Sequence, residues 1–390
     1  MKKIIYVLTI CVLFAGCEKY DSTQVSQKIN KRVLSGSETI LKENLDQAAI
    51  ILAEIMQDES VMNEVSVLYN DDRGFYMLSF EDLFNESKSP GNSFARLREQ
   101  FLGKCDAMGS KGTWQDLAGF LAKNGSYIYC PYPSSFYPKG TKSMTVAAHP
   151  VDNDEEGTGY RFEGKKMLQV TVNEEYADTY PVILIMPPDE KEIEYKGVDI
   201  KNADLSKGNP VYEVKVGKVR CASYCGGLFE GELELRISRG YPEFNLTTGS
   251  VTGKFSTVIP INYPRSYAKA AINDYTVHSY AGWYSIYLPW DTNWRSEKVQ
   301  QIMMVYEYDS VKESTINSSV GYKEDDLSST VSVSVKVTYS GDFLGIGEWD
   351  RDWFFATNTI PGPEDEVKDG WVVRKTCDYM KLTTPSRIIY

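Results

Sequence analysis

"VSVSVKVTY", residues 331–339, has the most regular β-pattern in the chain. Valine stands at every second position, with serine, lysine and threonine between. Because successive side chains of a strand point to opposite faces, this period of two predicts a strand with one buried and one solvated face. Leucine and isoleucine alternate with charged residues in the same way over residues 233–237. With glycine and proline between such segments and no helical stripe, residues 221–390 are predicted to form an antiparallel β-sandwich.

"PVILIMPP", residues 181–188, shows a second kind of strand pattern. An unbroken apolar run from Val182 to Met186 is typical of a strand that is buried on both faces. Residues 167–176 and 211–219 also have strand-like patterns. A mixed β region is therefore predicted between residues 126 and 220.

Before residue 126 the periodicity is helical. Ser35 and Glu38 have the spacing of a capping box at a helix N-terminus. The apolar residues that follow lie on one helical stripe: Ile40, Leu41, Leu45, Ala48, Ala49, Leu52, Ile55 and Met56. Two further helices are predicted around residues 94–102 and 113–121, so residues 36–125 are expected to form a helical domain.

The predicted fold class is therefore α+β, with an N-terminal helical region followed by a β-rich body and a C-terminal antiparallel β-sandwich. The expected divisions are a signal peptide at 1–16, a polar tether at 17–35, a helical domain at 36–125, a mixed β region at 126–220 and a β-sandwich domain at 221–390.

The N-terminus predicts where the chain resides. Two lysines precede a short apolar run from Ile4 to Phe14, which suits the h-region of a signal peptide and is too short to span a bilayer. "LFAGC", residues 13–17, then resembles the lipobox of bacterial lipoproteins, although leucine stands one position earlier than usual. The resemblance implies that Cys17 carries acyl chains and that the mature chain is anchored to a membrane.

The same resemblance implies an outer-membrane location, because Glu18 follows the cysteine instead of the aspartate that commonly retains lipoproteins at the inner membrane. Whether the chain faces the periplasm or the exterior stays open. The layout of tether, helices and β-rich body is similar to that of uncharacterised Bacteroidota cell-envelope lipoproteins, a likeness that carries no function.

Composition restricts the partners. The formal net charge is −12, which argues against nucleic acid, since phosphates are repelled by an acidic protein. Aromatic residues make up 13% of the chain, led by 27 tyrosines. They fit a large β-core or a sugar-stacking surface.

"DNDEEGTGYRFE", residues 152–163, is the strongest candidate for a metal site. Counted from residue 152, side chains that carry oxygen stand at positions one, three, five, seven and twelve, and a glycine stands at position six. The segment therefore resembles the calcium loop of EF-hand proteins. Its flanks have strand patterns, unlike the helices of an EF-hand. The alternative is a solvated acidic turn. The candidate Ca²⁺ ligands are Asp152, Asp154, Glu156, Thr158 and Glu163.

"GWYSIYLPWDTNW", residues 282–294, is the most aromatic stretch. Its rings could stack on a sugar, or one face of the strand could belong to the core. The candidate glycan-binding residues are Trp283, Tyr287, Trp290 and Trp294. A second acidic group, around residues 342–352, could hold calcium or be a set of solvated loops.

Motifs of common enzymes are mostly absent. The chain has two histidines, neither in HExxH, and no GxSxG or P-loop. Ser266 and Lys269 match the short SxxK pattern without its usual companion motifs. The predicted function is that of an outer-membrane-anchored lipoprotein with a binding or structural role, which engages a glycan or an envelope protein and is stabilised by calcium if residues 152–163 bind it. The alternatives are a secreted carboxylate-dependent, glycosidase-like hydrolase and a surface glycan-binding protein.

Overall fold

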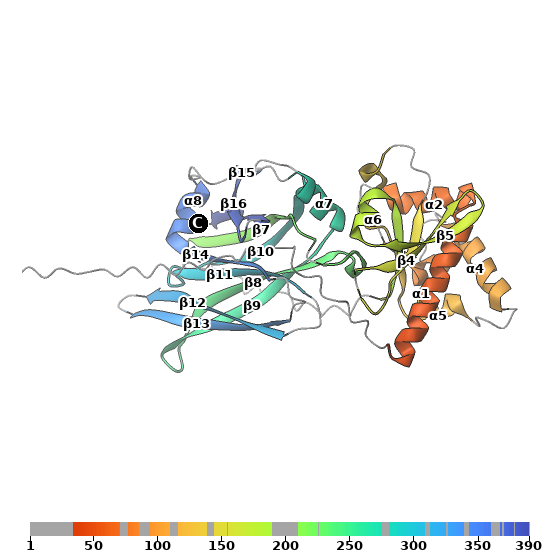
Figure 1. Cartoon of the computed structure of the whole chain (residues 1–390). Helices are drawn as coiled ribbons and strands as arrows, with labels where there is room; N and C mark the ends of the chain where they lie inside the picture. Colours follow the sequence, from red (N-terminus) through yellow and green to blue (C-terminus); the bar gives the residue numbers. More distant parts are fainter. Residues whose placement is uncertain are drawn as a thin grey trace, which may run out of the picture. The chain divides into compact units, whose positions relative to one another are not determined.

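The computed structural model describes most of the chain that follows the predicted tether (Figure 1). Residues Leu34–Tyr390 group as one unit. The described residues are 34–70, 77–85, 94–109, 116–138, 144–153, 155–188, 210–224, 226–274, 281–308, 313–324, 327–338, 343–359, 367–368, 370–377 and 379–389. None of the helices in these ranges combines the length and the apolar character that a membrane crossing needs.

The predicted capping box begins the first helix, α1 (Gly36–Ile55). The Ser35 hydroxyl accepts a hydrogen bond from the Glu38 backbone N–H, and the Glu38 carboxylate accepts one from the Ser35 N–H at 2.8 Å. Most of the predicted apolar stripe is buried, as expected for a helix that packs on one side. Ile40, the fifth residue of the helix, is 52% exposed, and Leu41 is partly buried.

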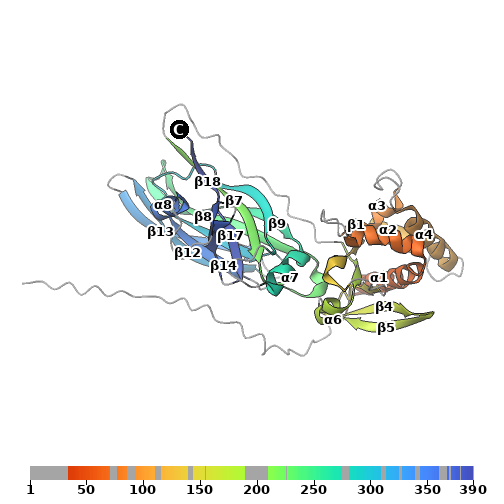
Figure 2. The same cartoon turned by 90° about the horizontal axis from the view of Figure 1, so that it is seen from above.

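Helix α1 packs on a six-stranded sheet with strand order β1-β2-β6-β3-β4-β5 (Figures 1 and 2). The strands are β1 (Met77–Ser79), β2 (Tyr127–Tyr129), β3 (Thr145–Ala148), β4 (Gly157–Glu163), β5 (Lys166–Val172) and β6 (Val182–Met186). The other helices of this part are α2 (Glu59–Asn70), α3 (Phe80–Phe84), α4 (Ala95–Gly109), α5 (Leu117–Lys123) and α6 (Glu174–Thr179).

Strand β6 is central and fully buried, as its unbroken apolar run predicts. It pairs in parallel with β3, with Val146 opposite Ile183, and antiparallel with β2. Parallel neighbours need a crossover connection, and the chain makes it through β4, β5 and α6.

The helices and this sheet share one hydrophobic core, which runs from Leu45 to Met186 and also takes in Leu228 and Phe229. The predicted boundary between residues 125 and 126 therefore falls inside a single core. The reason is that α1 buries its apolar stripe against the strands, so the helices do not form a separate domain.

The C-terminal part is a β-sandwich, and the predicted α+β class is confirmed. Strand β7 (Val211–Cys221) is the centre of one sheet, whose order is β10-β7-β17-β16-β15, with β18 also pairing to β7. The second sheet has the order β14-β11-β8-β9. The remaining strands are β8 (Leu233–Asn245), β9 (Ser250–Tyr263), β10 (Tyr284–Asp291), β11 (Gln300–Glu307), β14 (Phe343–Asp350), β15 (Val367–Lys368), β16 (Trp371–Lys375), β17 (Met380–Thr383) and β18 (Ser386–Ile389).

The core between these two sheets contains alternate residues of β7 and β8, including Val214, Val216, Leu235 and Ile237. Because β7 belongs to this core, the predicted boundary at 220/221 falls inside a strand of the sandwich.

Residues 331–338 contribute to a third layer, and residue 339 lies outside the described residues. Strand β13 (Leu327–Thr338) pairs with β12 (Glu313–Glu324), and this hairpin covers the outer face of β8, β9 and β11 (Figure 1). Strand β11 is consequently buried on both faces. Met303 and Val305 face the sandwich core, while Met304 packs with Val320 of the hairpin.

Three short helices differ from the sequence predictions. Residues 174–176, predicted as strand, begin α6, because Asn173 caps a helix there. The sandwich also contains α7 (Arg265–Asn273) and α8 (Arg351–Thr359), although no helical stripe marks them. Helices of nine residues show too few turns for a periodic pattern.

Candidate functional site

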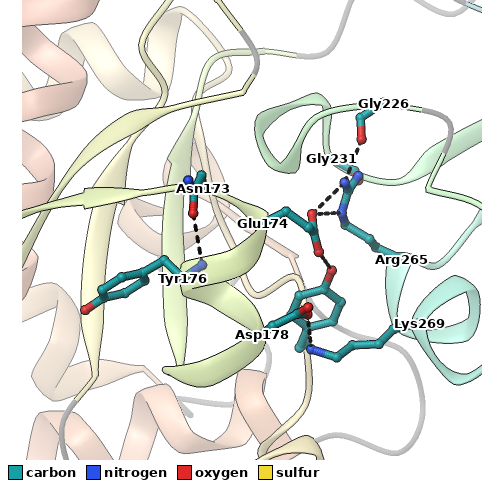
Figure 3. A network of polar contacts seen from close by, with 9 residues as sticks. Asn173, Glu174, Tyr176, Asp178, Gly226, Gly231, Arg265 and Lys269 are labelled. Atoms are coloured by element: carbon teal, nitrogen blue, oxygen red, sulfur yellow. Dashed lines mark hydrogen bonds and ion pairs between the residues drawn. The ribbon is translucent and has the colours of Figure 1, made fainter. Parts of the chain in front are cut away.

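Two of these unpredicted helices build the most extensive polar network that the structure describes (Figure 3). In α6, the Asn173 side chain accepts a hydrogen bond from the Tyr176 N–H at 2.9 Å, which sets the start of the helix. Glu174 and Asp178 are then four residues apart and share one face. In α7, Arg265 and Lys269 have the same spacing. Two acids on one helix therefore meet two bases on the other.

The Arg265 guanidinium is the centre of the network and is 1% exposed. Its Nη2 and Nε donate to Oε2 of Glu174 at 2.8 and 3.2 Å. Nη2 also donates to the Gly226 carbonyl at 2.9 Å, and Nη1 donates to the Gly231 carbonyl at 3.4 Å. The hydroxyl of Tyr132 donates a hydrogen bond to Oε1 of Glu174. The buried charge is thus matched by a carboxylate and two backbone carbonyls.

The charges inside this cluster counteract the effect of burial on the pKa of Arg265. Burial alone would lower the pKa of Arg265, but the Glu174 carboxylate and the nearby Tyr132 hold it above its ordinary value. Burial raises the pKa of Tyr132, and the Glu174 charge raises it further, while Arg265 acts in the opposite direction. The cluster therefore carries a charged arginine and a neutral tyrosine at all physiological pH values.

Lys269 makes the second link. Its Nζ lies 2.5 Å from Oδ1 of Asp178, and the residue is 6% exposed. The ammonium also lies 4.1 Å from the ring centroid of Tyr132, 5.6 Å from that of Phe136 and 5.9 Å from that of Tyr137. Three aromatic rings and one carboxylate therefore surround the ammonium group, which is a cation–π arrangement.

The network connects two cores. Tyr132, Glu174 and Asp178 belong to the helix and sheet part, whereas Arg265 and Lys269 belong to the sandwich. The Tyr224 ring lies 4.8 Å from the Arg265 guanidinium carbon and packs against both cores. The carboxylates that meet here are each paired with a cation. The arrangement is suited to holding two cores in register.

The predicted lipidation site, Cys17, lies outside the described residues.

The structure places the predicted calcium ligands at different points of the segment 152–163. Asp152 is bound to Lys42 at 3.2 Å, and Asp154 lies outside the described residues. The second half of the supposed loop is strand β4, so Thr158 pairs with Thr171, and Glu163 at the other end of the strand binds Arg161. Glu156 is exposed just before the strand.

Five residues of extended strand span roughly 16 Å, so the structure does not bring Glu163 to the other predicted ligands. The glycine at position 157 does not require a calcium loop, because a Cβ there would lie 2.4 Å from the ring of Phe229. In the described part of the chain, no group of three or more His, Cys, Asp or Glu is arranged to hold a metal. Calcium binding stays a prediction.

The four predicted glycan-binding residues do not form one surface. Trp290 and Trp294 are 4% and 0% exposed, and their ring centroids lie 5.5 Å apart in the sandwich core. Tyr287 is 44% exposed and lies in a bulge of β10 with φ of +48°. Trp283 is partly buried at the start of that strand. A stacking shelf made of all four is therefore not assembled, and the core alternative accounts for the two buried tryptophans.

Two weaker candidates have clear positions. Glu348, Asp350 and Asp352 of the second acidic group are exposed around the junction of β14 and α8. Ser266 is 5% exposed on α7, next to the residues of the network. Lys269 of the SxxK match is bound to Asp178 and is therefore not a free amine base.

Of the residues in this network, the sequence singles out only Lys269, as part of the SxxK match. Asn173 followed by Glu174 and Glu175 is a helix-start signal, which could have identified α6. Nothing in the sequence signals that Arg265 meets Glu174, because 91 positions separate them.

The chain matches no protein-family model, and no curated protein matches it significantly.

Proposed function

We propose that this chain is an outer-membrane-anchored lipoprotein with a binding or structural role at the cell envelope. The observation that supports this proposal is the sequence of residues 13–17, in which small residues precede a cysteine at the end of a short apolar run. In the proposal, the polar residues up to 35 tether the acylated cysteine to the folded part, which begins at the capped helix α1.

The network of α6 and α7 supports a structural role over a hydrolytic one. A carboxylate-dependent hydrolase needs two facing acids, one of which is free to donate a proton. Here Glu174 and Asp178 are held by Arg265 and Lys269. These contacts favour a chain that keeps a fixed arrangement of its two cores while it is tethered to a membrane.

The anchor is tested by the Cys17→Ser substitution, with Cys11→Ser as the matched control in the apolar run. Cells are grown with an alkyne analogue of palmitate, and the labelled chain is followed through membrane fractionation. Incorporation into the outer-membrane fraction is expected for the unchanged chain and for Cys11→Ser. Cys17→Ser is expected to lose both the label and the membrane association. A Cys17→Ser chain that keeps the label would refute the proposal.

A further inference from the structure

A second polar cluster lies where the sandwich core ends. Along β8 the residues that face the core are first Leu235 and Ile237, and the same alternation then places Arg239 and Tyr241. The inter-sheet space therefore changes from apolar to charged along one strand. The connection between β10 and β11 brings a further cation, Lys298, to this end of the sandwich.

Arg239 is fully matched in charge. Its Nη1 lies 2.6 Å from Oδ2 of Asp291, which is 5% exposed at the end of β10. Gln301 of β11 donates to the same oxygen at 2.7 Å, and the Asn293 N–H donates to the other carboxylate oxygen at 2.9 Å. This ion pair joins the two sheets.

Lys298 is different, because within the described residues it forms no ion pair. Its Nζ lies 4.2 Å from the ring centroid of Tyr241, on which the Arg239 guanidinium also packs at 4.6 Å. The backbone around it is held in place. The Lys298 carbonyl accepts a hydrogen bond from Trp294 Nε1 at 2.7 Å, and its N–H donates to the Arg295 carbonyl at 3.2 Å.

Charged groups of both signs lie around Lys298. Burial lowers the pKa of Lys298, and the Arg239 and Arg295 charges lower it further, while Asp291 and Glu243 act in the opposite direction. Arg295 lies at the exposed rim, with 65% of its side chain accessible, and its Nη1 lies 3.7 Å from Oε1 of Glu297. Because Asp291 is already bound to Arg239, and Glu243 lies 3.7 Å from Lys254, the ammonium lacks a partner of its own.

We propose that Lys298, with Arg295 at the rim, anchors a binding site for an oxyanion group, either free sulfate or the carboxylate of an acidic sugar. An oxyanion beside Lys298 would pair with the one cation of the cluster that has no carboxylate within ion-pair distance among the described residues. It would gain charge-assisted hydrogen bonds from the ammonium and, in competition with Glu297, from Arg295. The site does not depend on the lipid anchor proposed above, so either proposal can fail without the other.

The test measures the reactivity of individual lysines in the full chain, kept in detergent. Lysines are acetylated for short times at pH 8 in chloride, in sulfate and in galacturonate, all at one ionic strength, and the rates are read by mass spectrometry. An oxyanion on Lys298 stabilises the protonated amine, and each unit of pKa lowers the neutral fraction about tenfold. Acetylation of Lys298 is therefore expected to slow at least about threefold. Lys104, which is bound to Glu54 at 2.7 Å, is the internal control and is expected to keep its rate.

Thermal melting gives an independent readout. Sulfate or galacturonate is expected to raise Tm relative to chloride, because binding to the native state stabilises it. That increase is expected to vanish in Lys298→Gln, to shrink in Arg295→Gln and to persist in Lys104→Gln. Since Arg295 is a rim residue, its variant keeps the test decisive if Lys298→Gln folds poorly.

The outcomes separate the two sources of the anion. Protection of Lys298 by both probes supports a general oxyanion site, and protection by galacturonate alone supports a site for acidic sugars. Equal slowing of Lys298 and Lys104, no slowing by either probe, or an undiminished Tm increase in Arg295→Gln overturns the proposal.

Discussion

The contact between Arg265 and Glu174 makes a quantitative prediction, because the two partners differ sharply in burial. Arg265 is 1% exposed, whereas the Glu174 side chain is 27% exposed. Glu174→Gln leaves a buried guanidinium with neutral acceptors alone, which are the Gly226 and Gly231 carbonyls and the oxygen of the new amide. Arg265→Met leaves a carboxylate that still accepts from Tyr132 and can be reached by water.

Removing one partner of a buried pair costs about 3–5 kcal/mol when the remaining charge cannot be solvated. We expect Glu174→Gln to lower the free energy of unfolding by that amount. Arg265→Met is expected to cost about 1.5–3 kcal/mol, the value of a hydrogen bond to a charged group, because Glu174 regains water. The double variant removes both charges, so its cost is expected to be smaller than the sum of the single costs.

The assay is urea unfolding of a Cys17→Ser chain, followed by tryptophan fluorescence at pH 7. The matched control is Glu99→Gln, which breaks a pair with Arg96 in which the side chains are 62% and 68% exposed. That substitution is expected to change the free energy of unfolding by no more than about 0.5 kcal/mol. A larger loss for Arg265→Met than for Glu174→Gln, or losses below about 1 kcal/mol for both, would refute the assignment of Arg265 as the buried charge of the network.

Four further outcomes are expected. Trp294→Ala should lower the free energy of unfolding by about 3–5 kcal/mol in urea, since the ring is fully buried; a well-folded variant with no loss would contradict its place in the core. Ser35→Ala should cost about 1 kcal/mol in the same assay through loss of the α1 cap, and no change would show that the cap is dispensable. Burial raises the pKa of the Cys105 thiol from 9.0 to about 11. The stability that this thiol adds is complete below pH 9.0 and is lost as the pH rises toward 11. In urea titrations over that pH range, the difference in free energy of unfolding between the unchanged chain and Cys105→Ala should therefore shrink. A constant difference would argue against the burial of the thiol. If residues 152–163 bind calcium, calcium should raise Tm over excess chelator, and the shift should disappear in Asp152→Asn/Asp154→Asn.

Local signals predicted local structure well. The capping box of Ser35 and Glu38 begins helix α1, the buried run Val182–Met186 is strand β6, and residues 331–338 of the alternating stretch lie in strand β13. Each of these signals depends on contacts or periods within a few residues, which is why the sequence expresses them directly. Helix α6 was missed because its cap, Asn173, stands at the end of a convincing strand pattern.

Prediction from local sequence patterns was less successful for the candidate sites. The spacing of residues 152–163 suggested a calcium loop, but spacing cannot reveal that the second half is strand β4. Aromatic richness suggested a glycan surface, and only the packed sheets show that Trp294 is fully buried while Tyr287 is exposed. An aromatic residue looks the same in a core and on a surface, since its burial depends on what packs against it.

The sequence by itself determined the α+β class, the order of the main elements and the prediction of a lipid anchor at Cys17, because these depend on short-range patterns. Only the tertiary structure decided that the helices share a core with the first sheet, that Arg265 meets Glu174, and that Lys298 has no carboxylate partner among the described residues. Those contacts join residues that are distant along the chain. Their energies arise from burial and charge pairing, which exist only once the strands and helices have packed.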